Sequence, residues 1–187
     1  MASDRKGRII IISGPSGVGK GTVLKELMAE NPQIHLSVSA TTRSPREGEV
    51  DGVNYYFLTR EEFQRQIASG EMLEYAEYNG NYYGTPGGKV QEKLDAGVDV
   101  LLEIEVQGAQ KVMKARSDVI SIFILPPSRE ELERRLVGRG TEDAETIRKR
   151  LEASVYELSL ADHYQYRVVN DEVSRAVKEI EAILKQA

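Results

Sequence analysis

A continuous apolar run followed at once by a glycine-rich loop constrains this chain more than any other feature. Residues 8–13 read RIIIIS, and an unbroken β-branched run is typical of a strand buried on both faces. A helical pattern, TVLKELMAE, begins at Thr22. The order of strand, loop and helix predicts an α/β core with an anion-binding turn after its first strand. The residues of that turn are Gly14, Pro15, Ser16, Gly17, Val18, Gly19, Lys20, Gly21 and Thr22.

The composition of this turn suits phosphate. Glycines let successive backbone N–H groups turn toward phosphate oxygens, and the N-terminus of the following helix adds the positive end of its dipole. Lys20 adds a compact charge at the spacing of a P-loop, G-x-x-x-x-G-K. We therefore expect the loop to bind the phosphates of a nucleoside triphosphate. The alternative is a glycine-rich turn without a ligand, which the lysine and the strand–loop–helix context disfavour.

The residue after the lysine departs from the usual P-loop pattern. Gly21 stands where a Ser or Thr hydroxyl commonly reaches magnesium, and Thr22 follows one residue later. We therefore expect no direct metal ligand from the protein. Mg²⁺ would be held mainly by phosphates and water.

Apolar runs alternate with helical patterns along the rest of the chain. VDVLLEIE at 98–105 and VISIFIL at 119–125 have the character of central parallel strands. Helical patterns cover 107–115 and the C-terminus, where Val173, Val177, Ile180 and Leu184 share one face. This alternation predicts βαβ units in a layered α/β domain. Capping-box spacing predicts two further helix starts, at Thr59 with Glu62 and at Ser128 with Glu131.

Composition narrows the class of partner. The length of 187 residues favours a single domain, and a net charge of -5 argues against a protein that coats nucleic acid. We expect small anionic ligands instead. The chain has no cysteine, which excludes disulfides. The apolar run near its N-terminus, IIII at 9–12, is too short for a membrane span or a signal-peptide core. We expect a cytoplasmic protein with no membrane partner.

Two stretches break the alternation. Residues 37–89 are polar and aromatic and hold six of the nine tyrosines, which indicates surface chemistry more than core. Residues 127–150 are crowded with arginines on predicted helices around Gly138 and Gly140, a pattern typical of a mobile flap. Both stretches are candidates for ligand-binding parts on the α/β core.

The first of these stretches contains the elements of a monophosphate clamp. Arg43 and Arg46 are planar forks that suit a phosphate dianion. Tyr55 and Tyr83 can each donate a phenolic O–H to another oxygen of the same group. For two loop arginines alone, a solvated charged surface would be the better interpretation.

Taken whole, SVSATTRSPREGEVDGVNYYF at 37–57 and MLEYAEYNGNYYGTP at 72–86, with the P-loop, resemble guanylate kinases over nearly the whole chain. The resemblance implies a P-loop kinase three-layer fold with a central parallel sheet. It also implies ATP-dependent transfer of a phosphoryl group to GMP and dGMP. The implied parts are a core at 1–36, 90–126 and 151–187, an inserted mixed α+β GMP-binding region at 37–89, and a helical lid at 127–150.

The resemblance also assigns residues by their places in the family motifs. Glu105 stands where the family often has Asp, and Asn170 would lie near the adenine of ATP. The residues expected around GMP are Ser39, Arg43, Arg46, Tyr55, Glu74, Tyr83, Thr85 and Glu105. The catalytic residues expected are Lys20, Arg43 and the lid arginines Arg135, Arg139 and Arg150, which would swing over the triphosphate.

The chemistry of guanine agrees with this assignment. Guanine has an acceptor at O6 and donors at N1 and its exocyclic amine, so one carboxylate can accept two hydrogen bonds while a hydroxyl donates to O6. Glu74, with Ser39 or Thr85, fits those roles. Adenine would set its N1 lone pair against the carboxylate and leave polar groups unpaired. Without the resemblance, a surface glutamate on a strand would be the better interpretation of Glu74.

Three other functions compete with this reading. A GTPase switch would carry an N-K-x-D stretch, which the sequence lacks. A catalytically silent guanylate-kinase-like binding module would be expected to lose the phosphate loop or the arginines, and this chain keeps both. A kinase of another nucleoside monophosphate is disfavoured by Glu74 and the TTR-x-x-R segment.

The proposed reaction needs no general base, because a phosphate monoester is already mostly ionised at pH 7. We therefore interpret His35 and His163 as structural or surface residues.

Replacing the loop lysine tests the phosphate-loop assignment. Lys20→Ala should lose most turnover because the charge on the moving phosphoryl group is no longer neutralised. The fold should survive, as circular dichroism and a thermal melt would report. Retained turnover would show that the lysine is dispensable.

Overall fold

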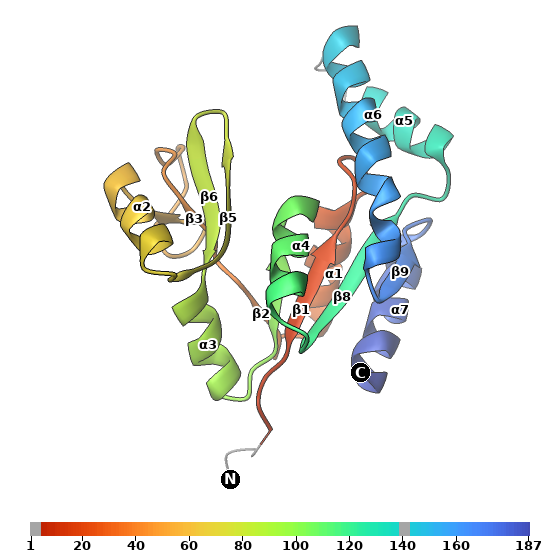
Figure 1. Cartoon of the computed structure of the whole chain (residues 1–187). Helices are drawn as coiled ribbons and strands as arrows, with labels where there is room; N and C mark the ends of the chain where they lie inside the picture. Colours follow the sequence, from red (N-terminus) through yellow and green to blue (C-terminus); the bar gives the residue numbers. More distant parts are fainter. Residues whose placement is uncertain (1–4, 139–142) are drawn as a thin grey trace. The chain divides into compact units, whose positions relative to one another are not determined.

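The computed structural model describes residues 5–138 and 143–187, and its first sheet carries the predicted central strands (Figure 1). This sheet has five strands in the order β2-β7-β1-β8-β9, and the pairs β2–β7 and β8–β9 run parallel. Every residue of β1 is buried, as the isoleucine run predicts. The strands are β1 (Ile9–Ser13), β2 (His35–Leu36), β7 (Val100–Glu103), β8 (Val119–Leu125) and β9 (Tyr166–Val169).

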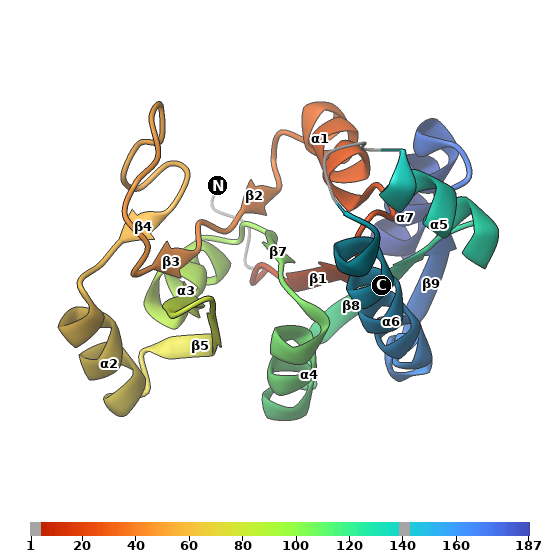
Figure 2. The same cartoon turned by 90° about the horizontal axis from the view of Figure 1, so that it is seen from above.

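Helices flank these strands in the alternation that the sequence predicts. On α7, Val177 and Ile180 are buried as expected, and Val173 and Leu184 at the two ends are half-buried. Helix α7 packs against α1, and the two lie side by side in Figure 2. The helices are α1 (Lys20–Glu30), α4 (Val106–Ala115), α5 (Arg129–Val137), α6 (Ala144–Ser159), α7 (Val173–Gln186) and the short 3₁₀ helix η1 (Ala161–His163).

The polar, aromatic stretch forms a second sheet of four strands in the order β4-β3-β6-β5. Strand β3 pairs parallel to β4 and antiparallel to β6, and β5 and β6 form an antiparallel hairpin. Helix α2 begins with the predicted capping box of Thr59 and Glu62. The elements are β3 (Ala40–Thr41), β4 (Tyr56–Phe57), α2 (Arg60–Ala68), β5 (Met72–Tyr78), β6 (Asn81–Pro86) and α3 (Gly87–Asp95).

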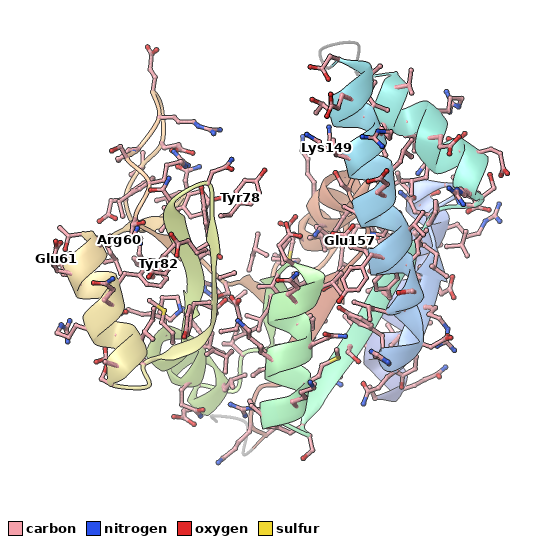
Figure 3. The ribbon with its side chains drawn as sticks, turned by 45° about the horizontal axis from the view of Figure 1, so that its top comes forward. Arg60, Glu61, Tyr78, Tyr82, Lys149 and Glu157 are labelled. Atoms are coloured by element: carbon pink, nitrogen blue, oxygen red, sulfur yellow. The ribbon has the colours of Figure 1, made fainter. Side chains whose placement is uncertain are left out.

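Phe63 of α2 packs against the second sheet. Its side chain has no exposed surface and stacks on Tyr82 of β6, with ring centroids 5.2 Å apart. Arg60 lies over the same tyrosine ring, 4.6 Å from its centroid. Both side chains are labelled in Figure 3. None of the six tyrosines in this stretch is fully buried. Tyr75 and Tyr78 are exposed and the other four are half-buried, so the surface chemistry expected of them stays a prediction.

The described residues divide into two compact units. One comprises residues up to 9, 33–102 and 107–118, and it holds the second sheet. The other comprises 10–32, 103–106 and 119–187, and it holds the glycine-rich loop, α5 and α6. Within residues 5–138 and 143–187, no helix combines the length and apolar character needed to cross a bilayer.

Asp99, just before β7, ties the N-terminal segment to its unit. Its carboxylate accepts hydrogen bonds from the Arg8 backbone N–H, Arg8 Nη2 and Arg5 Nη2, each 2.8 Å long. Burial raises the pKa of Asp99, but the hydrogen bonds from Arg8 and Arg5 outweigh it and hold the pKa below its usual value. The ionised form is therefore the one that stabilises the fold.

This carboxylate gives a pH-dependent contribution to stability. Asp99→Asn should lower the free energy of unfolding at pH 7 by about 1–3 kcal/mol, since charged donors lose their acceptor. The pKa of Asp99 is lower in the folded state than in the unfolded state. The extra stability of the wild type over Asp99→Asn is therefore complete above the unfolded-state pKa and is lost as the pH falls through the folded-state pKa. Urea unfolding of both proteins at pH 7 and pH 3 measures this. A difference that does not shrink at pH 3 would contradict it.

Candidate active site

The glycine-rich loop connects buried β1 to α1, and close contacts explain its glycines. Gly17 and Gly19 have φ of 83° and 89°, a left-handed conformation that favours glycine. A Cβ at Gly17 would lie 2.7 Å from Leu136 Cδ2, and one at Gly19 would lie 2.7 Å from Asn170 Nδ2. The helix begins at Lys20, two residues earlier than the sequence pattern indicates. Lys20 and the N-terminus of α1 therefore both lie at the loop, as a phosphate-binding site requires.

A cavity of about 300 Å³ opens at this loop. Gly14–Thr22 and Glu105 line it, so all nine predicted loop residues gather at one site. Glu105, predicted from its motif to lie near GMP, is exposed and stands on the wall of this cavity. The cavity combines backbone N–H groups, one lysine and one carboxylate, a set suited to a polyphosphate with a cation.

Two of the three predicted lid arginines contact the loop. Arg135 of α5 donates from Nη1 to the Val18 carbonyl at 3.0 Å, and Arg150 of α6 donates from Nη2 to Ser16 Oγ at 2.7 Å. Arg139, and Gly140 beside it, lie outside the described residues. The guanidinium groups of Arg135 and Arg150 are thus placed at the loop where the triphosphate was predicted.

Glu131 and Asn170 support the Arg135 contact. Arg135 Nε donates to Glu131 Oε1 at 2.8 Å, and hydrogen bonds from Arg134 and Arg135 lower the pKa of Glu131 to about 2. Asn170 is buried and donates from Nδ2 to the Val18 carbonyl at 2.9 Å. Its amide therefore braces the phosphate loop, while its predicted place near adenine stays a prediction.

Glu157 of α6 is a functional candidate that sequence reasoning missed. Its Oε2 accepts a hydrogen bond from the backbone N–H of Ser16 at 3.3 Å, and Figure 3 labels it on α6. Burial raises the pKa of this carboxyl, with Glu105 adding to the rise and Lys20 opposing it. The Glu157 carboxylate thus accepts a hydrogen bond from the Ser16 backbone N–H, a group of the kind that donates to phosphate oxygens in a phosphate-binding loop. No local pattern could have indicated this, because the contact joins residues 141 positions apart.

In the second sheet's unit, three of the four predicted clamp residues come together. Arg43 lies over the ring of Tyr55, 5.3 Å from its centroid, and the rings of Tyr55 and Tyr83 meet edge to face at 6.2 Å. A hydrogen bond with Tyr83 also contributes to raising the pKa of Arg43, after the larger effect of Glu49. Arg46, three residues on, has an exposed side chain. One guanidinium and two phenols are thus gathered as the clamp requires.

Glu49 orients the central arginine and was also missed. Arg43 donates from Nη1 to Glu49 Oε2 at 3.0 Å and from Nη2 to Oε1 at 2.9 Å, and the Arg46 backbone N–H donates to Oε2 at 2.7 Å. A third bond runs from Arg43 Nη1 to the Ser44 carbonyl at 2.7 Å. Because a guanidinium has five N–H donors, these bonds fix its plane and leave donors for phosphate. The spacing of Glu49 in RSPREGE could have indicated the pair.

The predicted base-binding carboxylate is buried and hydrogen-bonded. Glu74 on β5 is 8% exposed and lies opposite Thr85 on β6, whose Oγ1 donates to Glu74 Oε1 at 2.7 Å. Ser39 lies just before β3 with a half-buried side chain, and its carbonyl accepts from the Tyr56 N–H at 2.9 Å. Glu74 is therefore not the solvated strand residue that its type alone would suggest.

Comparison with known proteins assigns the chain to a family. The family model described as Guanylate kinase matches residues 6–187. This chain belongs to the guanylate kinase family. Guanylate kinases from Clostridium perfringens and Streptococcus pneumoniae are each 54% identical to it, over 97% and 96% of this chain and 84% and 87% of theirs. The crystal structure of guanylate kinase from Anaplasma phagocytophilum matches with a TM-score of 0.76 at 38% identity, covering 98% of this chain and 87% of that one. The predicted family and fold class are confirmed.

Glu49 can be tested as an orienting group in this family member. Glu49→Gln loses the two-point grip on Arg43, so kcat/KM for GMP should fall about tenfold while KM for ATP stays within about twofold. The exposed Glu47 in the same loop gives a matched control, and Glu47→Gln should behave as the wild type. Steady-state kinetics at saturating ATP measure both. A rise in kcat/KM for Glu49→Gln would mean that Glu49 opposes the phosphate instead of orienting Arg43.

Proposed function

We propose that this chain is an ATP:GMP phosphotransferase, which transfers the γ-phosphoryl group of ATP to the phosphate of GMP, and of dGMP, to form the diphosphate. Family membership supports the reaction class. The observation that carries the acceptor assignment is the buried Glu74 carboxylate paired with the Thr85 hydroxyl. We expect the reaction to take place in the cytoplasm, where both nucleotides occur.

Glu74 explains the choice of base. Each carboxylate oxygen has two lone pairs, so the Thr85 hydrogen bond leaves acceptors for guanine N1–H and the exocyclic amine. Because the single Thr85 O–H is donated to Glu74, the Ser39 hydroxyl would complete recognition at O6. Adenine has no donor at N1, and burying its lone pair against Glu74 would leave both groups unsatisfied.

The phosphate clamp positions the nucleophile. Arg43, Arg46, Tyr55 and Tyr83 would hold the GMP phosphate and point one oxygen toward ATP, with Glu49 fixing the plane of Arg43. At pH 7 that oxygen is already mostly deprotonated, because the second pKa of a phosphate monoester is about 6. Positioning and charge neutralisation are then the main catalytic requirements.

The phosphate loop would hold the donor. Its backbone N–H groups and Lys20 would bind the ATP phosphates, and Arg135, Arg139 and Arg150 would neutralise charge on the group in transfer. Glu157 would then give up the Ser16 N–H to a phosphate oxygen. The 127–150 lid, the 37–89 GMP-binding region and the remaining core are proposed as the working parts of the enzyme.

The residues at the loop fit a hydrated Mg²⁺. Gly21 offers no hydroxyl, while Thr22 and Glu105 are exposed oxygen donors on the cavity wall. In the part of the chain that the structure describes, no three His, Asp or Glu side chains form a metal cluster. Thr22 and Glu105 would therefore contact the ion through water. When bound, Mg²⁺ neutralises charge on the phosphates.

A panel of acceptors tests the function directly. With ATP and magnesium in a coupled assay, GMP and dGMP should be phosphorylated, and AMP, UMP and dTMP should react at least about 10³-fold more slowly, because the buried carboxylate rejects bases without matching donors. Equal rates with another monophosphate would contradict the base assignment. No turnover with any acceptor would instead support a silent binding module.

A further inference from the structure

Gly108, in the first turn of α4, lies directly against the base-binding carboxylate. It is buried, and a Cβ built on it would stand 2.5 Å from Glu74 Oε2 and 3.1 Å from Glu74 Cδ. Both residues belong to the same compact unit. Since real Cβ atoms do not approach other heavy atoms so closely, only glycine permits this arrangement of helix and carboxylate.

The carboxylate is held against moving aside. Glu74 Oε1 is fixed by the 2.7 Å hydrogen bond from Thr85, and the residue is 8% exposed. The helix is held as well, because Lys111, on the same face one turn later, donates from Nζ to the Tyr75 carbonyl at 2.7 Å. Tyr75 follows Glu74 on β5. Helix, strand and carboxylate are therefore fixed relative to one another at this point.

Nothing in the backbone requires glycine here. Gly108 is not among the residues with positive φ, and glycine within a helix is unfavourable relative to alanine. Gly88 of α3 provides the contrast, since a Cβ there would meet nothing within 4 Å. The close approach to Glu74 is thus the feature of Gly108 that a methyl group would destroy.

We propose that Gly108 is a positioning residue for guanine recognition, whose missing side chain keeps the Glu74 carboxylate in the orientation that accepts from N1–H and the exocyclic amine. This inference rests on the proposed function and adds a specificity determinant outside the nucleotide contacts predicted from the sequence. A methyl group at 108 would force Glu74 either to break its bond with Thr85 or to turn its oxygens. Either change would move the Glu74 oxygens out of hydrogen-bonding position for guanine N1–H and the exocyclic amine. ATP binding would be unaffected.

Gly108→Ala and the control Gly88→Ala test the proposal by kinetics. For Gly108→Ala, kcat/KM for GMP should fall at least about tenfold, and KM for ATP should stay within about twofold. The preference for GMP over inosine monophosphate, which lacks the exocyclic amine, should shrink by a similar factor. Gly88→Ala should keep wild-type kinetics and melt at or above the wild-type temperature, because a methyl group there meets nothing. Gly108→Ala should melt somewhat below the wild type, because the strained or broken bond between Glu74 and Thr85 costs more than the gain in helix propensity. Wild-type kinetics for Gly108→Ala would overturn the proposal.

A double-mutant cycle with Glu74→Ala separates positioning from a general folding role. Truncating Glu74 removes the group that the methyl would strike, so Gly108→Ala should have no further effect on GMP kinetics in that background. If Gly108→Ala alone fails to fold, the double variant should fold again. An additive loss, or failure of both variants to fold, would overturn the proposal. A wild-type protein that does not phosphorylate GMP would instead refute the proposed function.

Discussion

A buried or half-buried charge needs a partner, and that constraint shapes both functional parts of this protein. In the second sheet's unit, Arg43 is held by Glu49 and Glu74 by Thr85. In the unit of the phosphate loop, Arg135 is held by Glu131 and by the Val18 carbonyl. Each pair keeps a charged group in one orientation. Under the proposed function, substrate anions and bases would meet groups that are already placed, which lowers the ordering cost of binding.

Glycine is the second means of placing these groups. Gly17 and Gly19 let the loop approach Leu136 and Asn170, and Gly108 lets α4 approach Glu74. In each case a helix or loop comes closer to a neighbouring side chain than a Cβ atom would allow. For Gly108, which lies within a helix, the cost relative to alanine is about 0.5–1 kcal/mol, small beside the loss from a misplaced catalytic group.

Several elements of the fold could be predicted from the sequence because the residues that determine them are close together along the chain. The isoleucine run of β1, the P-loop spacing and the Thr59 capping box each depend on neighbours in sequence, and each is present as predicted. The partners of the functional groups were less accessible. Glu157 reaches Ser16 across the fold, and Gly108 reaches Glu74 from another element. Such contacts depend on how elements pack, which periodicity and spacing do not encode.

The central claim is that one site reads a guanine base with Glu74 and a phosphate with Arg43 and its neighbours. Titration calorimetry with GMP, guanosine and AMP, without ATP, tests it most directly. The account predicts a measurable heat and saturable binding for GMP, binding at least about a hundredfold weaker for guanosine, which lacks the phosphate, and none for AMP. The absence of any heat with GMP, or equal affinity for GMP and AMP, would contradict it.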